Sequence, residues 1–207
     1  MMKPSDALLI IDVQNDFCSG GALAVPNGEA VVAPINRLAK KFDVVVATQD
    51  WHTPSHNSFA SHHHGKEAFQ TTELDYGTQV LWPDHCIQGT KGAEFHPDLD
   101  LLRCQMIVRK GFRPGIDSYS AFCENDRKTT TGLAGFLKER GIKRVFLTGL
   151  ATDFCVFYSA MDALADGFEV VLVEDACRAI DLDGSLAAAR AAMAKAGVVT
   201  MQSGALS

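Results

Sequence analysis

An apolar run near the start of the chain, Ala7-Leu8-Leu9-Ile10-Ile11, is typical of a central β-strand that is buried on both faces. Further strand-like runs lie at residues 43–48, 105–109, 144–148, 169–173 and 198–201. Helical patterns lie at residues 29–41, 130–140, 153–166 and 185–196. Because strands that alternate with helices form right-handed crossovers, the sequence predicts an α/β fold with three α/β/α layers and a mostly parallel central sheet.

A single domain is predicted over residues 1–207, because a chain with 47% hydrophobic and 21% charged residues can bury a sizeable core. One segment, at about residues 50–103, breaks the alternation of strand and helix. It is rich in His, Pro, Gly and Ser and has no sustained period, and a loop region of this length is usually functional or disordered. Its aromatic residues and histidines favour a functional insertion. The run at residues 62–64 (His-His-His) is expected to be a solvated loop, with a metal role as the alternative.

Composition and charge bear on partners and compartment. The formal net charge is −6 and the pI about 5.6, which gives no electrostatic support for binding to nucleic acid or to an anionic membrane surface. No segment has the roughly 18 consecutive apolar residues of a membrane span, and the first residues lack the cleavage site of a secretory signal. Scattered cysteines without a CxxC pair indicate reduced thiols, so a cytoplasmic protein is expected. The cysteines are Cys18, Cys86, Cys104, Cys123, Cys155 and Cys177.

Four predicted strands end in a polar or reactive residue. Asp12 follows the first strand, Asp50 the second and Lys110 the third, and the fourth runs through Gly149 into a sharp turn that carries Cys155. Since ligands bind outside the carboxyl ends of parallel strands, we expect these side chains to converge on one edge of the sheet. A single polar residue at such a position can equally be a solvated strand end. Four such residues at one edge, one of them a cysteine at a helix start, favour a catalytic site.

Cys155 is the candidate nucleophile. If Thr152 is the N-cap of the following helix, Cys155 is the third helical residue, and the positive end of the helix dipole lowers the pKa of its thiol. Its backbone N–H can then serve as an oxyanion donor. Asp12 can take the thiol proton and give it to a departing amine, while Lys110 holds that carboxylate in place. The alternative is an ordinary buried cysteine, the commonest environment of a free thiol.

A second group of residues has the composition of a metal site. Asp50 and His52 lie two residues apart in an extended segment and can present both side chains to one ion, and His85 can supply a third ligand. One carboxylate and two imidazoles suit one divalent ion of zinc, iron or manganese, with positions left open for water or substrate. A fourth contact can come from Ser58, His56 or water. The alternative is a set of loop histidines without a metal.

These motifs together resemble the nicotinamidase branch of the isochorismatase-like cysteine hydrolases. The matching segments are residues 9–17 (LIIDVQNDF), 48–52 (TQDWH), 82–86 (WPDHC), 108–111 (VRKG) and 149–155 (GLATDFC). The first and last mark the superfamily, whereas the Asp-Trp-His and Trp-Pro-x-His-Cys segments point to its metal-bearing nicotinamidases. The matches follow the family's order along nearly the whole chain, so the resemblance implies the isochorismatase-like hydrolase fold.

The resemblance also implies a role for particular residues of this sequence. The catalytic triad corresponds to Asp12, Lys110 and Cys155. The metal ligands correspond to Asp50, His52 and His85. The oxyanion donors correspond to the backbone N–H groups of Ala151 and Cys155, beside a Leu150–Ala151 peptide that is cis in similar proteins. The walls of the substrate pocket correspond to Phe17, Leu23, Trp82 and Tyr119, for which ordinary packing is the alternative.

The implied activity is the hydrolysis of nicotinamide to nicotinate and ammonia through a cysteine thioester, in NAD salvage, with pyrazinamide as a further substrate. A related amidohydrolase that cleaves another small amide or a carbamoyl compound without metal is the alternative within the superfamily. A binding or redox-sensing protein that keeps the fold is the alternative outside the enzymes, and a complete triad argues against it. Apolar helix faces permit a homodimer without requiring one.

Overall fold

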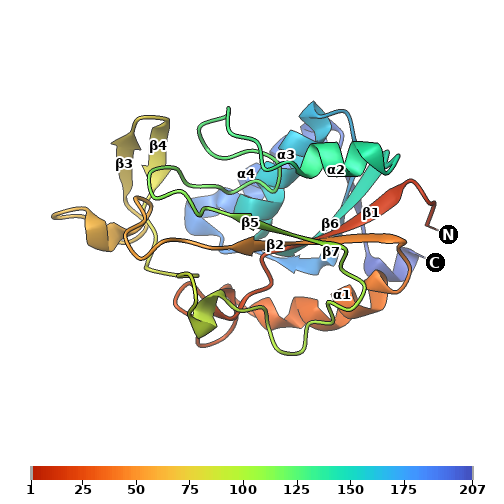
Figure 1. The fold of residues 1–207 in the computed structure, drawn as a ribbon, viewed down its shortest axis with the longest axis horizontal. Coiled ribbons are helices and arrows are strands. Elements are labelled where there is room, and N and C mark those ends of the chain that lie inside the picture. The colour runs from red at the N-terminus through yellow and green to blue at the C-terminus, as the bar shows by residue number, and fades with distance from the viewer. Residues whose placement is uncertain (1, 207) are drawn as a thin grey trace.

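Six β-strands form a parallel sheet through the centre of the molecule in the computed structural model, which describes residues 2–206 (Figure 1). In chain order they are β1 Asp6–Ile11, β2 Val44–Asp50, β5 Met106–Lys110, β6 Arg144–Leu150, β7 Glu169–Arg178 and β8 Val199–Met201. Their order across the sheet is β5-β2-β1-β6-β7-β8, and every neighbouring pair is parallel. The predicted α/β fold is therefore confirmed. Residues 1 and 207, the ends of the predicted domain, lie outside the described residues.

Strand β1 is buried on both faces, as its unbroken apolar run predicts. Leu8 and Ile10 face one apolar cluster, whereas Ala7, Leu9 and Ile11 face the other. All of these side chains are fully buried. Successive residues of a strand point to opposite faces of the sheet, so a strand without polar residues requires a cover on each side.

Helices supply that cover and complete the three layers (Figure 1). Helix α1 (Val32–Ala39) packs on one face of the sheet, and α2 (Leu133–Glu139), α3 (Phe157–Ala165) and α4 (Ser185–Ala196) pack on the other. Because α1 begins at Val32, Pro34 lies in its first turn, where a missing N–H costs no helical hydrogen bond.

The segment between β2 and β5 contains structure that the sequence did not predict. It forms an antiparallel hairpin of β3 (Thr71–Leu74) and β4 (Gly77–Val80). Both strands are only four residues long and mostly exposed or half-buried, so hydrophobic alternation does not mark them. Figure 1 shows the hairpin beyond the sheet, on the side where the parallel strands end.

The strand order brings distant parts of the chain together at this edge. Asp50 is paired directly with Lys110 in the register of β2 and β5, and Ile11, which precedes Asp12, is paired with Gly149 of β6. After β1, the chain adds β2 and β5 on one side of it and then β6, β7 and β8 on the other. A topological switch point therefore lies between β1 and β6. Ligands bind at such points in open parallel sheets.

Candidate active site

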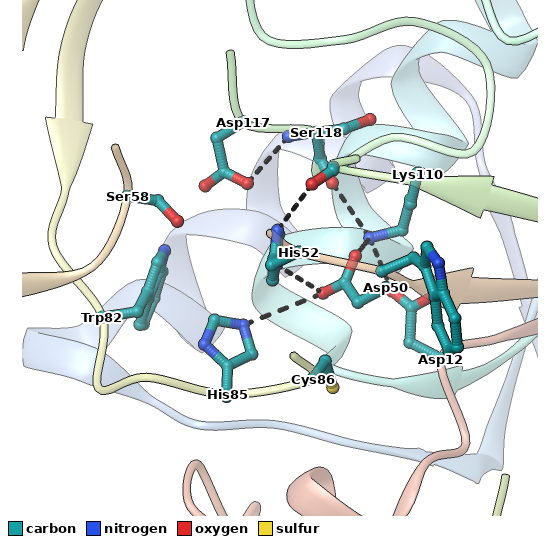
Figure 2. Close-up of polar contacts among 12 residues, drawn as sticks. Asp12, Asp50, His52, Ser58, Trp82, His85, Cys86, Lys110, Asp117 and Ser118 are labelled. Atoms are coloured by element: carbon teal, nitrogen blue, oxygen red, sulfur yellow. Dashed lines mark hydrogen bonds and ion pairs between the residues drawn. The ribbon is translucent and has the colours of Figure 1, made fainter. Parts of the chain in front are cut away.

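The Lys110 ammonium is the centre of a buried polar cluster at the carboxyl edge of the sheet (Figure 2). Its Nζ lies 2.8 Å from Asp12 Oδ2 and 3.4 Å from Cys155 Sγ, and it also contacts Asp50 Oδ1. It donates a further hydrogen bond of 2.9 Å to the Ser118 carbonyl oxygen. Burial opposes the charged form of Lys110, but Asp12 and Asp50 outweigh burial and raise its pKa well above the usual value. Lys110 is therefore held in its charged form.

Asp12 follows β1 in a left-handed backbone conformation, with φ 47°, which turns the chain out of the strand. Aspartate is one of the few residues that adopt this conformation readily. Asp12 Oδ1 accepts a hydrogen bond of 2.6 Å from the Thr48 hydroxyl. Complete burial raises the pKa of Asp12 to about 6, although Lys110 opposes the shift. A carboxylate with this pKa can accept and return a proton near neutral pH.

Cys155 lies in the turn after β6, but not at the predicted helical position. The turn Thr152–Val156 is a π-helix whose N-cap is Ala151 rather than Thr152. The predicted lowering of the thiol pKa is also wrong, because burial raises the pKa of Cys155 well above its usual value despite Lys110. The thiol therefore keeps its proton until a base removes it. The Leu150–Ala151 peptide is cis, as the resemblance implies.

Asp50, His52 and His85 bring three candidate ligand atoms together beside this cluster (Figure 2). Asp50 Oδ2 lies 3.6 Å from His52 Nε2 and 3.9 Å from His85 Nε2. His52 Nδ1 is 2.9 Å from the Gly111 carbonyl oxygen, and His85 Nδ1 is 2.8 Å from the Pro83 carbonyl oxygen. Because a carbonyl only accepts, each Nδ1 carries a proton, so Nε2 is the ring nitrogen that each histidine can offer to a metal ion. This donor set fits a divalent metal ion.

The protonation states of Asp50 and His85 suit a cation. Burial disfavours protonated His52, but Asp50 outweighs burial and raises the pKa of His52, so this proton must leave when a metal binds. Burial disfavours ionised Asp50, but Lys110 and His52 outweigh burial and hold the pKa of Asp50 below its usual range. Burial and the neighbouring His52 lower the pKa of His85 to about 4, so this imidazole is neutral and can bind a metal. Gly111 has φ +64°, and a Cβ there would lie 2.4 Å from His52 Cε1, so glycine is required for this approach.

His56 and Ser58, the candidates for a fourth metal contact, are both buried. His56 Nδ1 accepts the Ser58 backbone N–H at 3.2 Å and lies 2.7 Å from the Ser58 hydroxyl oxygen. His56 Nε2 lies 3.3 Å from the Ile116 carbonyl oxygen. Both nitrogens of His56 are thus used within the protein, whereas the Ser58 hydroxyl oxygen keeps lone pairs after donating its proton. This arrangement favours Ser58 or water over His56.

Both groups of polar residues open onto the same pocket. Asp50, His52, His85 and Cys155 line it. All the predicted substrate residues and the predicted oxyanion residue Ala151 also line it. The substrate residues are Phe17, Leu23, Trp82 and Tyr119. Trp82 Nε1 donates a hydrogen bond of 3.1 Å to the Tyr119 hydroxyl oxygen, so the two rings are held together.

Three further pocket residues were not predicted: Asp117, Phe154 and Ile180. Phe154 packs edge-to-face on Trp82, with ring centroids 4.8 Å apart, and its place next to Cys155 was an available signal. Ile180 follows the carboxyl end of β7, which continues to Arg178, whereas the predicted strand at residues 169–173 ends too early to indicate it. Asp117 lies in a segment without a helix or strand, and no pattern marks it.

Other predicted features lie outside the pocket. His62 Nε2 and His63 Nε2 hydrogen-bond to the carbonyl oxygens of Pro54 and Asn57, and both side chains are at least partly exposed, as expected of a solvated loop. All six cysteines are free. Within residues 2–206, no helix combines the length and apolar content that crossing a membrane requires.

The chain is similar to known proteins over nearly all of its length. A family model described as the isochorismatase domain matches residues 6–204. A nicotinamidase of Acinetobacter baylyi is 54% identical over 197 residues, which cover 95% of this chain and 92% of that protein. The structure of a nicotinamidase/pyrazinamidase of Acinetobacter baumanii has a TM-score of 0.98 at 55% identity and covers 100% of both chains.

Two other similar structures contain bound groups. PnC1 from L. infantum, in complex with nicotinate, has a TM-score of 0.87 at 43% identity and covers 99% of this chain and 96% of its own. The pyrazinamidase of Pyrococcus horikoshii, in complex with zinc, has a TM-score of 0.78 at 36% identity and covers 96% of this chain and 99% of its own. Relatives with this fold therefore include a nicotinate complex and a zinc complex.

Proposed function

The chain belongs to the isochorismatase family, and on that basis we propose that the pocket between the Lys110 cluster and the group Asp50, His52 and His85 is its active site. The protein is an amidohydrolase that converts nicotinamide to nicotinate and ammonia, a reaction of NAD salvage. The observation that carries the site assignment is that buried Lys110 contacts Asp12, Asp50 and Cys155, and that Asp50 and Cys155 line the pocket. Pyrazinamide is accepted as well, since relatives are pyrazinamidases.

Cys155 is the nucleophile in this proposal, and Asp12 is its base. Asp12 takes the thiol proton, and the Lys110 ammonium, 3.4 Å from the sulfur, stabilises the thiolate that forms. The thiolate attacks the carboxamide carbon and forms a C–S bond. As the C–N bond then breaks, Asp12 returns its proton to the amide nitrogen, so that ammonia departs and a thioester remains. Water then hydrolyses the thioester to nicotinate and restores the thiol.

The remaining walls of the pocket orient the substrate and hold the developing charge. The backbone N–H groups of Ala151 and Cys155 are the proposed donors to the oxyanion, and the position of both residues on the pocket wall supports this role. Phe17, Trp82 and Tyr119, with Leu23 beside them, enclose the pyridine ring. Apolar walls of this kind fix the ring so that the carboxamide meets the sulfur.

Asp50, His52 and His85 are the proposed ligands of one divalent ion of zinc, iron or manganese, and the zinc complex of a relative supports the assignment. When bound, the ion supplies a Lewis-acid position at which the pyridine nitrogen is oriented. Their convergent lone pairs disfavour the alternative of a metal-independent enzyme for another small amide.

We propose residues 1–207 as one domain, with residues 50–103 as its metal- and substrate-binding segment. The free thiols support a cytoplasmic location.

The test is a stoichiometric assay. Purified, metal-loaded protein is incubated with nicotinamide, and ammonia and nicotinate are measured together. We expect equal amounts of both products, and slower or comparable release from pyrazinamide. A folded, metal-loaded protein that releases neither product would contradict the proposed activity and would require a screen of other small amides.

A further inference from the structure

Asp117 is a buried carboxylate on the pocket wall that has no part in the reaction described above. It lies within reach of the metal site, because ligand atoms of His52, His56 and Asp117 are all within 4.8 Å of one another. His52 is thus shared by this group and by the group with Asp50 and His85. In Figure 2, Asp117 and His85 lie on opposite sides of His52.

The carboxylate of Asp117 is held firmly but is not saturated. Asp117 Oδ1 accepts the Ser118 backbone N–H at 2.8 Å, and Oδ2 accepts the Gln79 side-chain amide at 2.8 Å. An ionised carboxylate offers about four lone-pair sites, so these two hydrogen bonds leave acceptor capacity unused. Gln79 belongs to β4, so the hairpin fixes the position of this charge.

Two other groups near the cation site are already committed to contacts within the protein. Both nitrogens of His56 are engaged by Ser58 and Ile116. The Asp50 carboxylate already forms an ion pair with Lys110 through Oδ1, so part of its negative charge is compensated.

A count of buried charges leads to the same residue. Asp12 and Asp50 carry one negative charge each, and Lys110 neutralises one of them. The cluster without Asp117 therefore balances only one charge of a divalent ion. With Asp117 it balances both, and a buried ion is tolerated when its charge is compensated nearby.

We propose that Asp117 is a positioning residue of the metal site, whose carboxylate supplies the second negative charge that a divalent ion at Asp50, His52 and His85 requires. The inference rests on the proposed metal site and adds a residue to it. Loss of the charge weakens metal binding by about 10- to 100-fold, the usual effect of removing a group that supports metal ligands. We expect the metal-free protein to fold without this charge.

The experiment measures the affinity for Zn²⁺ by competition with a fluorescent chelator. The variants are Asp117→Asn, which removes the charge, and Asp117→Glu, which keeps it. Asp162→Asn is the matched control, because Asp162 is a buried carboxylate paired with Arg127 and does not line the pocket. Thermal unfolding of each metal-free protein separates metal binding from folding. If Asp117→Asn does not fold, Asp117→Ala removes the charge without placing an amide donor against Gln79.

The expected result is weakened Zn²⁺ binding for Asp117→Asn, while Asp117→Glu and Asp162→Asn stay close to the unsubstituted protein. Equal affinity for Asp117→Asn and the unsubstituted protein would overturn the inference. Equal losses for the Asn and Glu variants would also overturn it, because shape rather than charge would then be responsible. Absence of Zn²⁺ binding by the unsubstituted protein would instead overturn the metal site itself.

Discussion

The pocket joins two regions of the molecule that are held in different ways. Asp12, Lys110 and Cys155 stand at or just beyond the ends of β1, β5 and β6, where pairing of backbones fixes their relative positions. His52 and His85 stand in the irregular segment, where hydrogen bonds from their rings to carbonyl oxygens orient them. A parallel sheet thus places the reacting groups and Asp50, whereas individual side-chain contacts place the two metal-binding histidines.

Different consequences follow from damage to each region. Removal of a reacting group should stop the chemistry while metal and substrate still bind. Removal of a binding group should release the metal while the thiol remains in place. The experiments below separate the two regions in this way.

Cys155→Ala should have the largest effect on turnover. Without the thiol no thioester forms, and a loss of at least about 10⁴-fold in kcat is expected, as for other enzymes that lose a covalent nucleophile. Metal content, measured by elemental analysis, should be unchanged. Cys177→Ala is the control, since Cys177 is a buried free thiol that does not line the pocket. A Cys155→Ala protein that keeps most of its activity would refute the nucleophile assignment.

Lys110→Met should affect stability most. The substitution leaves the buried carboxylates of Asp12 and Asp50 without their counter-charge, which typically costs about 3–5 kcal/mol of unfolding free energy. Urea denaturation measures the change. Lys138→Met, which removes an exposed ion pair with Asp166, should cost no more than about 1 kcal/mol. Similar losses in both variants would show that the Lys110 cluster is not the electrostatic centre of the site.

His85→Ala should act on the other region. Loss of one ligand should weaken metal binding by more than about 100-fold, since even supporting residues contribute 10- to 100-fold. Alkylation of Cys155 by iodoacetamide, followed by mass spectrometry, should still proceed, because the Lys110 cluster does not contain His85. His62→Ala should change neither property. Full metal affinity in His85→Ala would exclude His85 as a ligand.

The pH profile should show the smallest of these effects. Asp12 must be ionised to accept the thiol proton, so kcat/KM should fall as the pH drops through the Asp12 pKa of about 6. Thr48→Val removes a hydroxyl that donates to the Asp12 carboxylate, so the pKa rises and the acidic limb moves to higher pH. Thr129→Val removes a comparable bond to Asp126 and should leave the profile in place. An unshifted limb in Thr48→Val would argue against Asp12 as the base.

The same contrast explains what the sequence could predict. The apolar run of β1 and the strand-like runs after it predicted the parallel sheet, and with it the meeting of Asp12, Asp50 and Lys110, because strand ends share one edge. The turn from a strand into a helix at Cys155 was predicted, but the direction of its pKa shift was predicted wrongly, because burial in this π-helical turn outweighs the effect expected of a helix start.

The hairpin and Asp117 were outside the reach of sequence patterns. The strands β3 and β4 bury too few side chains to show a period. Asp117 joins the pocket because the folded chain brings Gln79 of the hairpin into contact with it, although the two residues are 38 positions apart in the sequence. Contacts of this kind depend on tertiary packing and leave no local signal.

The central claim is that both regions act on one substrate in one pocket. The most direct test is ammonia release from nicotinamide by a single preparation that is measured as purified, after chelation and after Zn²⁺ is restored, with Cys155→Ala carried in parallel. We expect release that is lost with the metal, recovered with Zn²⁺ and absent in Cys155→Ala under every condition. Release that continues unchanged after complete removal of the metal would contradict the claim and indicate a metal-independent amidohydrolase.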